Sequence, residues 1–103
     1  MKQIKAFIHR NRTADVVAAL QGEGYNTLTV VDVKGMLDAL DRREQGYSVE
    51  LGVAAITEVK LELICEDDRV EQAVAVIREK ARTGQTHAGW VYVIDVAQAY
   101  PIE

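Results

Sequence analysis

The apolar residues of this 103-residue chain change their spacing in a fixed order, and that order limits the folds open to it. The period of two that is typical of strands occurs in residues 2–9 and 57–65. Residues 25–33 are rich in the Thr and Val that strands favour, and residues 90–96 are expected to form a further strand. The spacing of three and four that is typical of helices occurs in residues 14–21 and 70–81. We therefore predict an α+β fold, a ferredoxin-like βαββαβ sandwich with a four-stranded antiparallel sheet and two helices on one face.

The two expected helices carry different end signals. Thr13 is the expected cap of a helix that starts at Ala14, and Gly22 and Gly24 are expected to stop it. The second helix has the stronger pattern, with apolar residues at Val70, Ala73, Val74, Ile77 and Ala81. Asp68 and Glu71 resemble a capping box, and Gly84 suits the C′ position.

Two helices can cover only one face of a four-stranded sheet. The other face carries many apolar residues, namely Phe7, Thr29, Val31, Val33, Ile64, Tyr92 and Ile94. So much apolar surface is unusual on a face that only water contacts. We therefore predict that copies of the chain associate through the sheet.

The composition, the net charge and the number of cysteines limit the class of protein to which this chain can belong. Apolar residues make up 49% of the chain and charged residues 27%, which is the composition of one globular domain. The net charge of −4 argues against nucleic acid as a partner. Cys65 is the only cysteine, which suits a reducing compartment, and no stretch approaches the about 18 apolar residues of a spanning helix. We expect a cytoplasmic protein.

A long connection separates the second and third strands. Residues 36–56 show no clean period, and so long an excursion in a small domain is often functional. Asp67 and Asp68 are neighbours at a helix start, where carboxylates favour the helix dipole rather than form a catalytic pair. The chain offers no coherent set of acid, base and nucleophile, so we predict that it is not an enzyme.

Several segments together resemble the P-II nitrogen regulatory signalling proteins, nearly from end to end. They are Met1-Lys-Gln-Ile4, Leu28-Thr-Val-Val-Asp-Val-Lys-Gly35, Glu58-Val-Lys-Leu-Glu-Leu63, Glu66-Asp-Asp68, Ala81-Arg-Thr-Gly-Gln85 and Val91-Tyr-Val-Ile-Asp-Val-Ala97. The resemblance implies one domain over residues 1–103, a homotrimer, and an effector cleft between each pair of subunits. It also implies a partner-binding T-loop at about 36–56, a ligand-binding B-loop at about 82–90 and a C-terminal tail at 97–103.

The resemblance also implies site residues. Those expected to bind a nucleotide or other effector are Thr29, Gly35, Met36, Leu37, Ile64, Arg82, Thr83, Gly84, His87 and Gly89. Those expected to contact a target protein, a transporter or a metabolic enzyme, are Arg42, Arg43, Tyr47 and Glu50. Membrane contact is expected only through a transporter partner.

The phosphate-binding part of the family pattern is missing. The B-loop of typical members has Gly-Asp-Gly-Lys where this chain has His87-Ala-Gly-Trp90, and their basic C-terminal residues fall on Pro101 and Glu103. A triphosphate needs cations and donors close by. We therefore predict that ATP with magnesium binds weakly or not at all, and that AMP, ADP or bicarbonate is the effector. A tyrosine that some members modify falls on Leu51, which argues against that modification.

Other interpretations stay open. A trimeric adaptor that has lost ligand binding would also lack the phosphate-binding residues of the family pattern. A metal-binding trimer could use His9 and His87, although no metal-ligand spacing supports it, and no metal site is predicted. Cys65 is expected to be a small buried hydrophobe. Trp90 could stack on a base or fill a gap between subunits.

Overall fold

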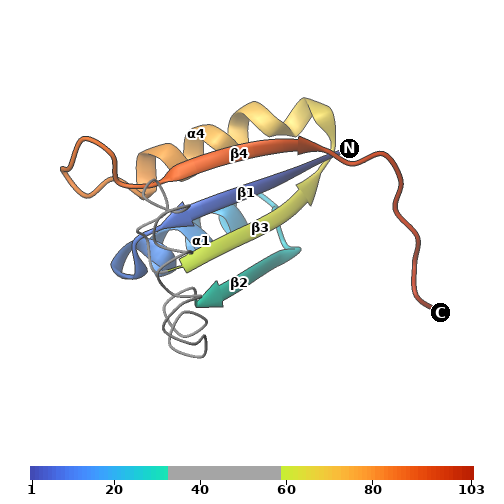
Figure 1. The fold of residues 1–103 in the computed structure, drawn as a ribbon, viewed down its shortest axis with the longest axis horizontal. Helices are drawn as coiled ribbons and strands as arrows, with labels where there is room; N and C mark the ends of the chain where they lie inside the picture. Colours follow the sequence, from blue (N-terminus) through green and yellow to red (C-terminus); the bar gives the residue numbers. More distant parts are fainter. Residues whose placement is uncertain (33–58) are drawn as a thin grey trace, which may run out of the picture.

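A four-stranded antiparallel sheet with two helices on one face makes up the part of the chain that the computed structural model describes, residues 1–32 and 59–103. The strands are β1 (Lys2–Ile8), β2 (Leu28–Asp32), β3 (Val59–Cys65) and β4 (Trp90–Asp95), in the spatial order β2-β3-β1-β4 (Figure 1). The helices are α1 (Thr13–Gly22) and α4 (Val70–Lys80). The predicted fold class is confirmed. Strand β2 begins three residues later than expected.

Strand β1 is the centre of the sheet because it pairs with both β3 and β4. Its alternate residues Ile4, Ala6 and Ile8 point toward the helices and are almost completely buried. The other buried residues of the core are Val16, Leu20, Tyr25, Val59, Leu61, Leu63, Ala73, Ile77 and Ala81. Most of these come from the two helices and from β3, as the apolar spacing predicts, whereas Tyr25 lies before β2 and Ala81 directly follows α4. None is larger than tyrosine.

Both helices begin differently from the prediction. A short 3-10 turn precedes each one, η1 (Arg10–Arg12) before α1 and η3 (Asp67–Arg69) before α4. The residue before each helix is therefore already near helical dihedrals, whereas a capping side chain works from an extended residue. The predicted caps at Thr13 and Asp68 are wrong. Asp67 instead accepts a hydrogen bond from the amino group of Met1 at 2.6 Å, which lowers the pKa of its carboxyl.

Gly24 ends the first helix, as the sequence predicts. Its φ of +91° is a left-handed conformation that glycine adopts at little cost. The Gly24 N–H donates to the Gln21 carbonyl and the Tyr25 N–H donates to the Leu20 carbonyl, each at 3.0 Å. These two bonds form a Schellman motif, which turns the chain toward β2. The predicted C′ glycine of the second helix is wrong, because α4 ends at Lys80 with Ala81 as its cap and Gly84 lies further on.

Tyr25 joins the end of α1 to the start of α4. Its ring is 4% exposed, and its hydroxyl donates to the Arg69 carbonyl at 2.7 Å. The Arg69 guanidinium lies 4.1 Å from the centre of the same ring. Burial raises the pKa of the Tyr25 hydroxyl, because it penalises the charged form. This cluster fixes the two helices relative to each other on the sheet.

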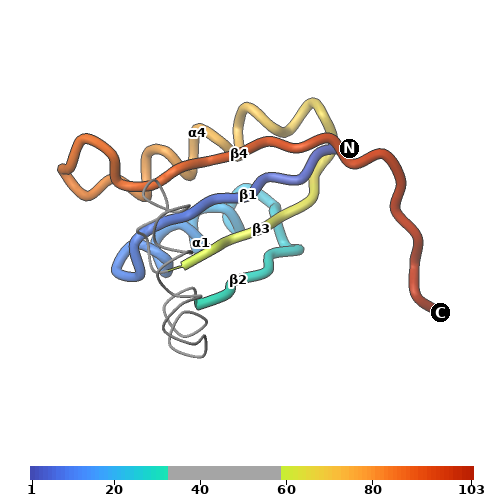
Figure 2. The backbone as a smooth tube through the Cα atoms, in the orientation of Figure 1, coloured from blue at the N-terminus to red at the C-terminus, as the bar shows by residue number. Residues whose placement is uncertain are grey.

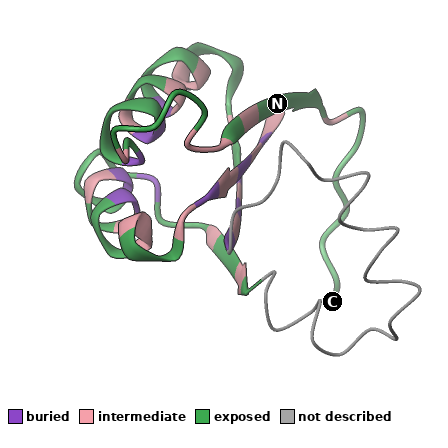
Figure 3. Ribbon diagram, turned by 60° about the vertical axis from the view of Figure 1, so that its left-hand side comes forward, coloured by how far each residue is buried: buried purple, intermediate pink, exposed green. Residues whose placement is uncertain are grey.

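The face of the sheet that points away from the helices is called the open face here. By strand register it comprises Gln3, Lys5, Phe7, Thr29, Val31, Lys60, Glu62, Ile64, Trp90, Tyr92 and Ile94. Figure 3 shows both helices on the opposite side. Ile64, Trp90, Tyr92 and Ile94 are each more than 40% exposed in the single chain. The open face therefore presents apolar side chains that the described part of the subunit does not cover.

The C-terminal segment leaves the sheet after β4 and runs away from the body of the subunit (Figure 2). Tyr100 and Ile102 on it are highly exposed. None of the helices formed by residues 1–32 and 59–103 has the length and the apolarity that crossing a membrane requires.

Replacing Tyr25 by phenylalanine tests the link between the helices. Y25F keeps the ring and removes the hydroxyl that donates to the Arg69 carbonyl, so it should lower the free energy of unfolding by about 1 kcal/mol. Denaturant titration at a fixed chain concentration measures the change. Y100F is the control, because Tyr100 is exposed and should tolerate the loss. Equal stability of Y25F and the parent protein would contradict this account.

Candidate functional site

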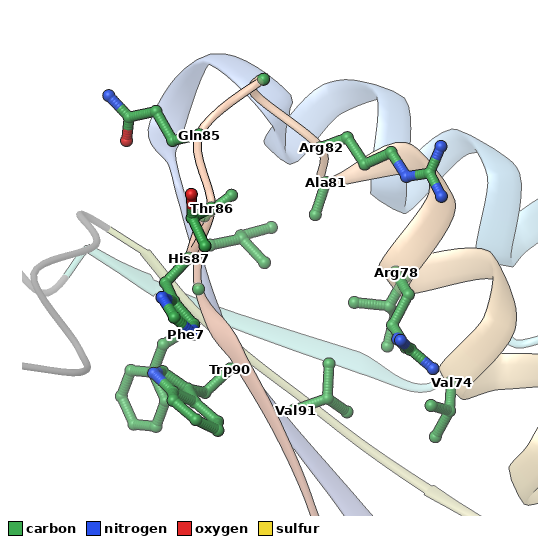
Figure 4. A pocket seen from close by; sticks show the side chains of 15 residues that line it. Phe7, Val74, Arg78, Ala81, Arg82, Gln85, Thr86, His87, Trp90 and Val91 are labelled. Carbon is green, nitrogen blue, oxygen red and sulfur yellow. The ribbon is translucent and has the colours of Figure 1, made fainter.

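A cleft of about 700 Å³ opens where α4 ends and β4 begins (Figure 4). Its walls come from the end of β1, the last turns of α4, the connection 81–89 and the start of β4. The connection is the segment that the resemblance identifies as the B-loop. A volume of this size is in the range of small-molecule sites in proteins, which is roughly 300–1,000 Å³.

The connection 81–89 is fixed at both ends. Ala81 is buried, and its N–H donates to the Ile77 carbonyl at 2.9 Å, which continues the helical hydrogen bonding of α4. Gly89 at the other end touches β1, where a side-chain Cβ would lie only 2.0 Å from the carbonyl oxygen of Phe7. Gly89 also has a φ of +154°. Only glycine allows this close approach, so the loop enters β4 at one defined point.

Aromatic rings gather on one side of the cleft. The His87 and Trp90 rings are stacked, with centroids 5.9 Å apart and planes 12° apart. Trp90 is in turn stacked on Tyr92 at 6.5 Å and 21°. Phe7 meets Tyr92 edge to face at 6.1 Å. In Figure 4 the His87, Trp90 and Phe7 rings lie on one side of the start of β4.

Two arginines lie on the other side of the start of β4, toward α4 (Figure 4). Arg78 is in the last turn of α4, and Arg82 follows its cap. Both are exposed and line the cleft. They give this wall two cations, which can attract an anion.

The structure brings together four of the predicted effector-binding residues. Arg82, Gly84, His87 and Gly89 all line the cleft. Thr83 belongs to the same connection, and its hydroxyl accepts a hydrogen bond from the Gln85 N–H at 3.4 Å. The role of these residues in binding an effector stays a prediction.

Two further predicted residues lie elsewhere. Thr29 is on the open face of β2, and Ile64 lines a second hollow of about 340 Å³ near the end of β3. Ile64 is four residues beyond Lys60, which is in register with Phe7 and hence with Trp90. That offset is roughly 13 Å along the strand. A small ligand at the aromatic end of the cleft therefore does not reach Ile64 of the same subunit.

The remaining predicted site residues lie outside the described residues. They are Gly35, Met36 and Leu37 of the expected effector site and Arg42, Arg43, Tyr47 and Glu50 of the expected partner-binding loop. Their roles stay predictions.

Cys65 lines the second hollow at the end of β3 and is partly buried, as a small apolar residue at the margin of the core. Burial raises the pKa of its thiol, and the Arg69 charge opposes that effect. The thiolate, which is the nucleophilic form, is therefore disfavoured. Among residues 1–32 and 59–103, no three His, Cys, Asp or Glu side chains gather as a metal-binding group.

Most of the residues that line the cleft were not among the predicted site residues, and Arg78 and Phe7 are two examples. Arg78 follows the helical pattern as a basic residue near the C-terminus of a helix, where it would simply favour the dipole. Phe7 is expected from its alternation to lie on the open face, and it does. Its place next to Gly89 depends on the pairing of β1 with β4, which the local sequence does not indicate.

Comparison with known proteins gives evidence on the family of this chain that does not depend on the geometry of the cleft. The family model described as nitrogen regulatory protein P-II matches residues 1–103. The chain is 35% identical over 96 residues to nitrogen regulatory protein P-II 1 of Methanothermobacter thermautotrophicus, covering 93% of this chain and 84% of that protein. It is 34% identical over 102 residues to nitrogen regulatory protein P-II 1 of Escherichia coli, covering 99% and 91%.

A solved structure agrees in fold. The crystal structure of Arabidopsis thaliana PII bound to citrate superposes with a TM-score of 0.67 and 27% sequence identity, covering 92% of this chain and 76% of that one. The structural similarity therefore extends over most of this chain.

Alanine at Gly89 should disturb the cleft more than alanine at Gly84. G89A places a Cβ against the Phe7 carbonyl oxygen, so we expect a loss of about 3 kcal/mol or more in the free energy of unfolding. G84A is the matched control, because Gly84 also has a positive φ but faces open space, and about 1 kcal/mol is expected. Denaturant titration measures both variants. Equal losses would mean that the close contact at Gly89 is unimportant.

Proposed function

The chain belongs to the nitrogen regulatory protein P-II family, whose members are signal transducers rather than enzymes, and on that premise we propose that it senses a small effector and regulates a partner protein. The effector is AMP, ADP or bicarbonate, bound at the cleft beside connection 81–89. The partner is a transporter or a metabolic enzyme, contacted through residues 36–56. The family match over residues 1–103, together with a cleft at the B-loop position, is the observation that carries the proposal.

The cleft argues for a weakly charged effector. Arg78 and Arg82 are the arginines among its lining residues, and His87 and Trp90 occupy positions where the family pattern has phosphate-binding residues. A triphosphate placed here would keep charges without close partners, which costs several kcal/mol. The Arabidopsis relative is bound to citrate in its crystal structure, so a small anion can be a ligand of this fold.

Assembly into a homotrimer supplies the rest of the proposed site. The open face carries exposed Ile64, Tyr92 and Ile94, which association would bury. Thr29 and Ile64 lie too far from the aromatic end of the cleft for one ligand to reach both within a subunit. In the trimer, the open face of one subunit contributes these residues to the cleft of the next.

The strand register connects the cleft to the segment proposed to bind the partner. Ile8, which lines the cleft, pairs with Val59, and Val59 pairs with Asp32. Asp32 and Val59 border segment 33–58. The sheet residues on either side of this segment therefore lie at the same end of the sheet as the cleft. Arg10 and Asp32 form an ion pair at 2.6 Å at the same end. An effector in the cleft is thus one strand away from the root of the proposed partner-binding segment.

Light scattering tests the assembly. We expect a particle of about three times the 11.4 kDa chain mass at micromolar concentration. Replacing exposed apolar residues of the open face, as in I94E, should shift the mass toward that of one chain, because a buried unpaired carboxylate opposes association. D15N, on the helix side of the subunit, is the control and should leave the mass unchanged. A single-chain mass for the parent protein would overturn the intersubunit cleft.

Calorimetry tests the effector. AMP or ADP should bind at least about tenfold more tightly than ATP with magnesium, a difference of about 1.4 kcal/mol. The same titration with bicarbonate covers the small-anion alternative. No heat with any of these ligands would overturn sensing by them and favour the ligand-independent adaptor.

A further inference from the structure

The wall of the cleft that lies between α4 and β4 combines an apolar surface with a cationic rim. Half-buried Val74 and Val91 form the surface together with buried Ile77. Exposed Arg78 and Arg82 form the rim. Figure 4 shows the two arginines and the two valines on the same side of the start of β4. These five residues are called the helix-side wall.

The charge of the cleft is opposite to that of the whole protein. The chain has a net charge of −4, yet none of the described residues that line the cleft is Asp or Glu. Within residues 1–32 and 59–103, no carboxylate forms an ion pair with Arg78 or Arg82. A guanidinium can donate two parallel hydrogen bonds to one carboxylate. The rim therefore favours an anionic ligand.

The end of a helix attracts cations even where no ligand binds, so the position of Arg78 near the end of α4 does not by itself assign it a role. Lys80 is a second cation of the same last turn, and it is not among the residues that line the cleft. The helix dipole accounts for a positive charge at either position. It does not account for arginines placed beside an apolar surface in a cleft whose described lining has no carboxylate.

The apolar surface continues along β4, away from the arginines. Val93 is in register with Ile4 and therefore lies on the helix side of β4, where it is 46% exposed. It is two residues beyond Val91, which is about 7 Å along a strand. An elongated apolar group can lie along this row with its charged end at the rim. Bicarbonate has no apolar part and would leave the valines exposed to water.

We propose that the helix-side wall binds an aliphatic monocarboxylate. The carboxylate contacts Arg78 and Arg82. The hydrocarbon chain lies on Val74, Val91 and Val93. This site goes beyond the proposed function, because it requires neither a nucleotide nor a partner protein. It is also separate from the open face, which is on the other side of the sheet and which the proposed trimer buries.

Calorimetry on the full-length protein with a series of aliphatic carboxylates tests the site. Hexanoate, octanoate and decanoate, each below its micelle concentration, should bind with an affinity that rises by up to about fourfold for each added methylene. Octanol has the chain without the charge and should bind at least about tenfold more weakly than octanoate. An affinity that does not depend on chain length would overturn the site, as would equal affinity for octanol and octanoate.

Charge-removing variants test whether the arginines recognise the carboxylate. R78Q and R82Q should each weaken octanoate binding by about tenfold or more, because each removes a cation that contacts the carboxylate. K80Q is the matched control, since it removes one positive charge from the same end of α4 outside the cleft, and it should bind octanoate as the parent protein does. Equal losses in all three variants would assign the effect to net charge and overturn the site.

The same titrations separate this site from the proposed effector. Heat with AMP, ADP or bicarbonate and none with octanoate or decanoate would overturn the carboxylate site and leave the proposed effector sensing intact. Chain-length-dependent heat with the carboxylates and none with AMP, ADP or bicarbonate would support the carboxylate site and overturn sensing by those three effectors.

Discussion

The burial of β1 beneath the two helices determines where the other described features of the molecule lie. Ile4, Ala6 and Ile8 are almost completely removed from water, and each fully buried aliphatic side chain contributes about 1.5–3 kcal/mol through the hydrophobic effect. Because side chains alternate along a strand, the same burial places Phe7 on the open face. The carbonyl of Phe7 then receives Gly89, and its ring supports Tyr92.

The open face combines apolar margins with a polar centre. Glu62 accepts a hydrogen bond from Gln3 at 2.7 Å and an ion pair from Lys60 at 3.0 Å, so both of its carboxylate oxygens are paired. Around this centre stand exposed Ile64, Tyr92 and Ile94. Lys60 and Glu62 can be buried by association as a pair, because their charges already satisfy each other. The open face also restricts the orientation of a neighbouring subunit, because its apolar margins must meet apolar surface of that subunit.

The apolar period predicted the strands, the helices and the core, because burial depends on side chains that the sequence states directly. The helix starts were not predictable in the same way. Thr13 and Asp68 have the chemistry of caps, but the 3-10 turns before α1 and α4 change the backbone on which a cap depends. For the site, the position of the connection 81–89 followed from the resemblance. The contact of Gly89 with β1 and the stacking of His87 on Trp90 depend on strand pairing between distant residues, which no local pattern encodes.

A rigid frame beneath two chemically variable segments explains how one fold can serve different signals. The connection 81–89 is fixed at Ala81 and Gly89, and segment 33–58 is bordered by Asp32 and Val59, which pair with each other. Ala81 and Gly89 hold the backbone of the connection between them, so phosphate-binding residues there can give way to rings while the frame persists. A ligand can shift an equilibrium between two conformations of a protein only if it contacts the two differently. On the proposed function, the pairing of Ile8 with Val59 gives a short path from the cleft to the border of segment 33–58, and the coupling would not require a long-range rearrangement of the sheet.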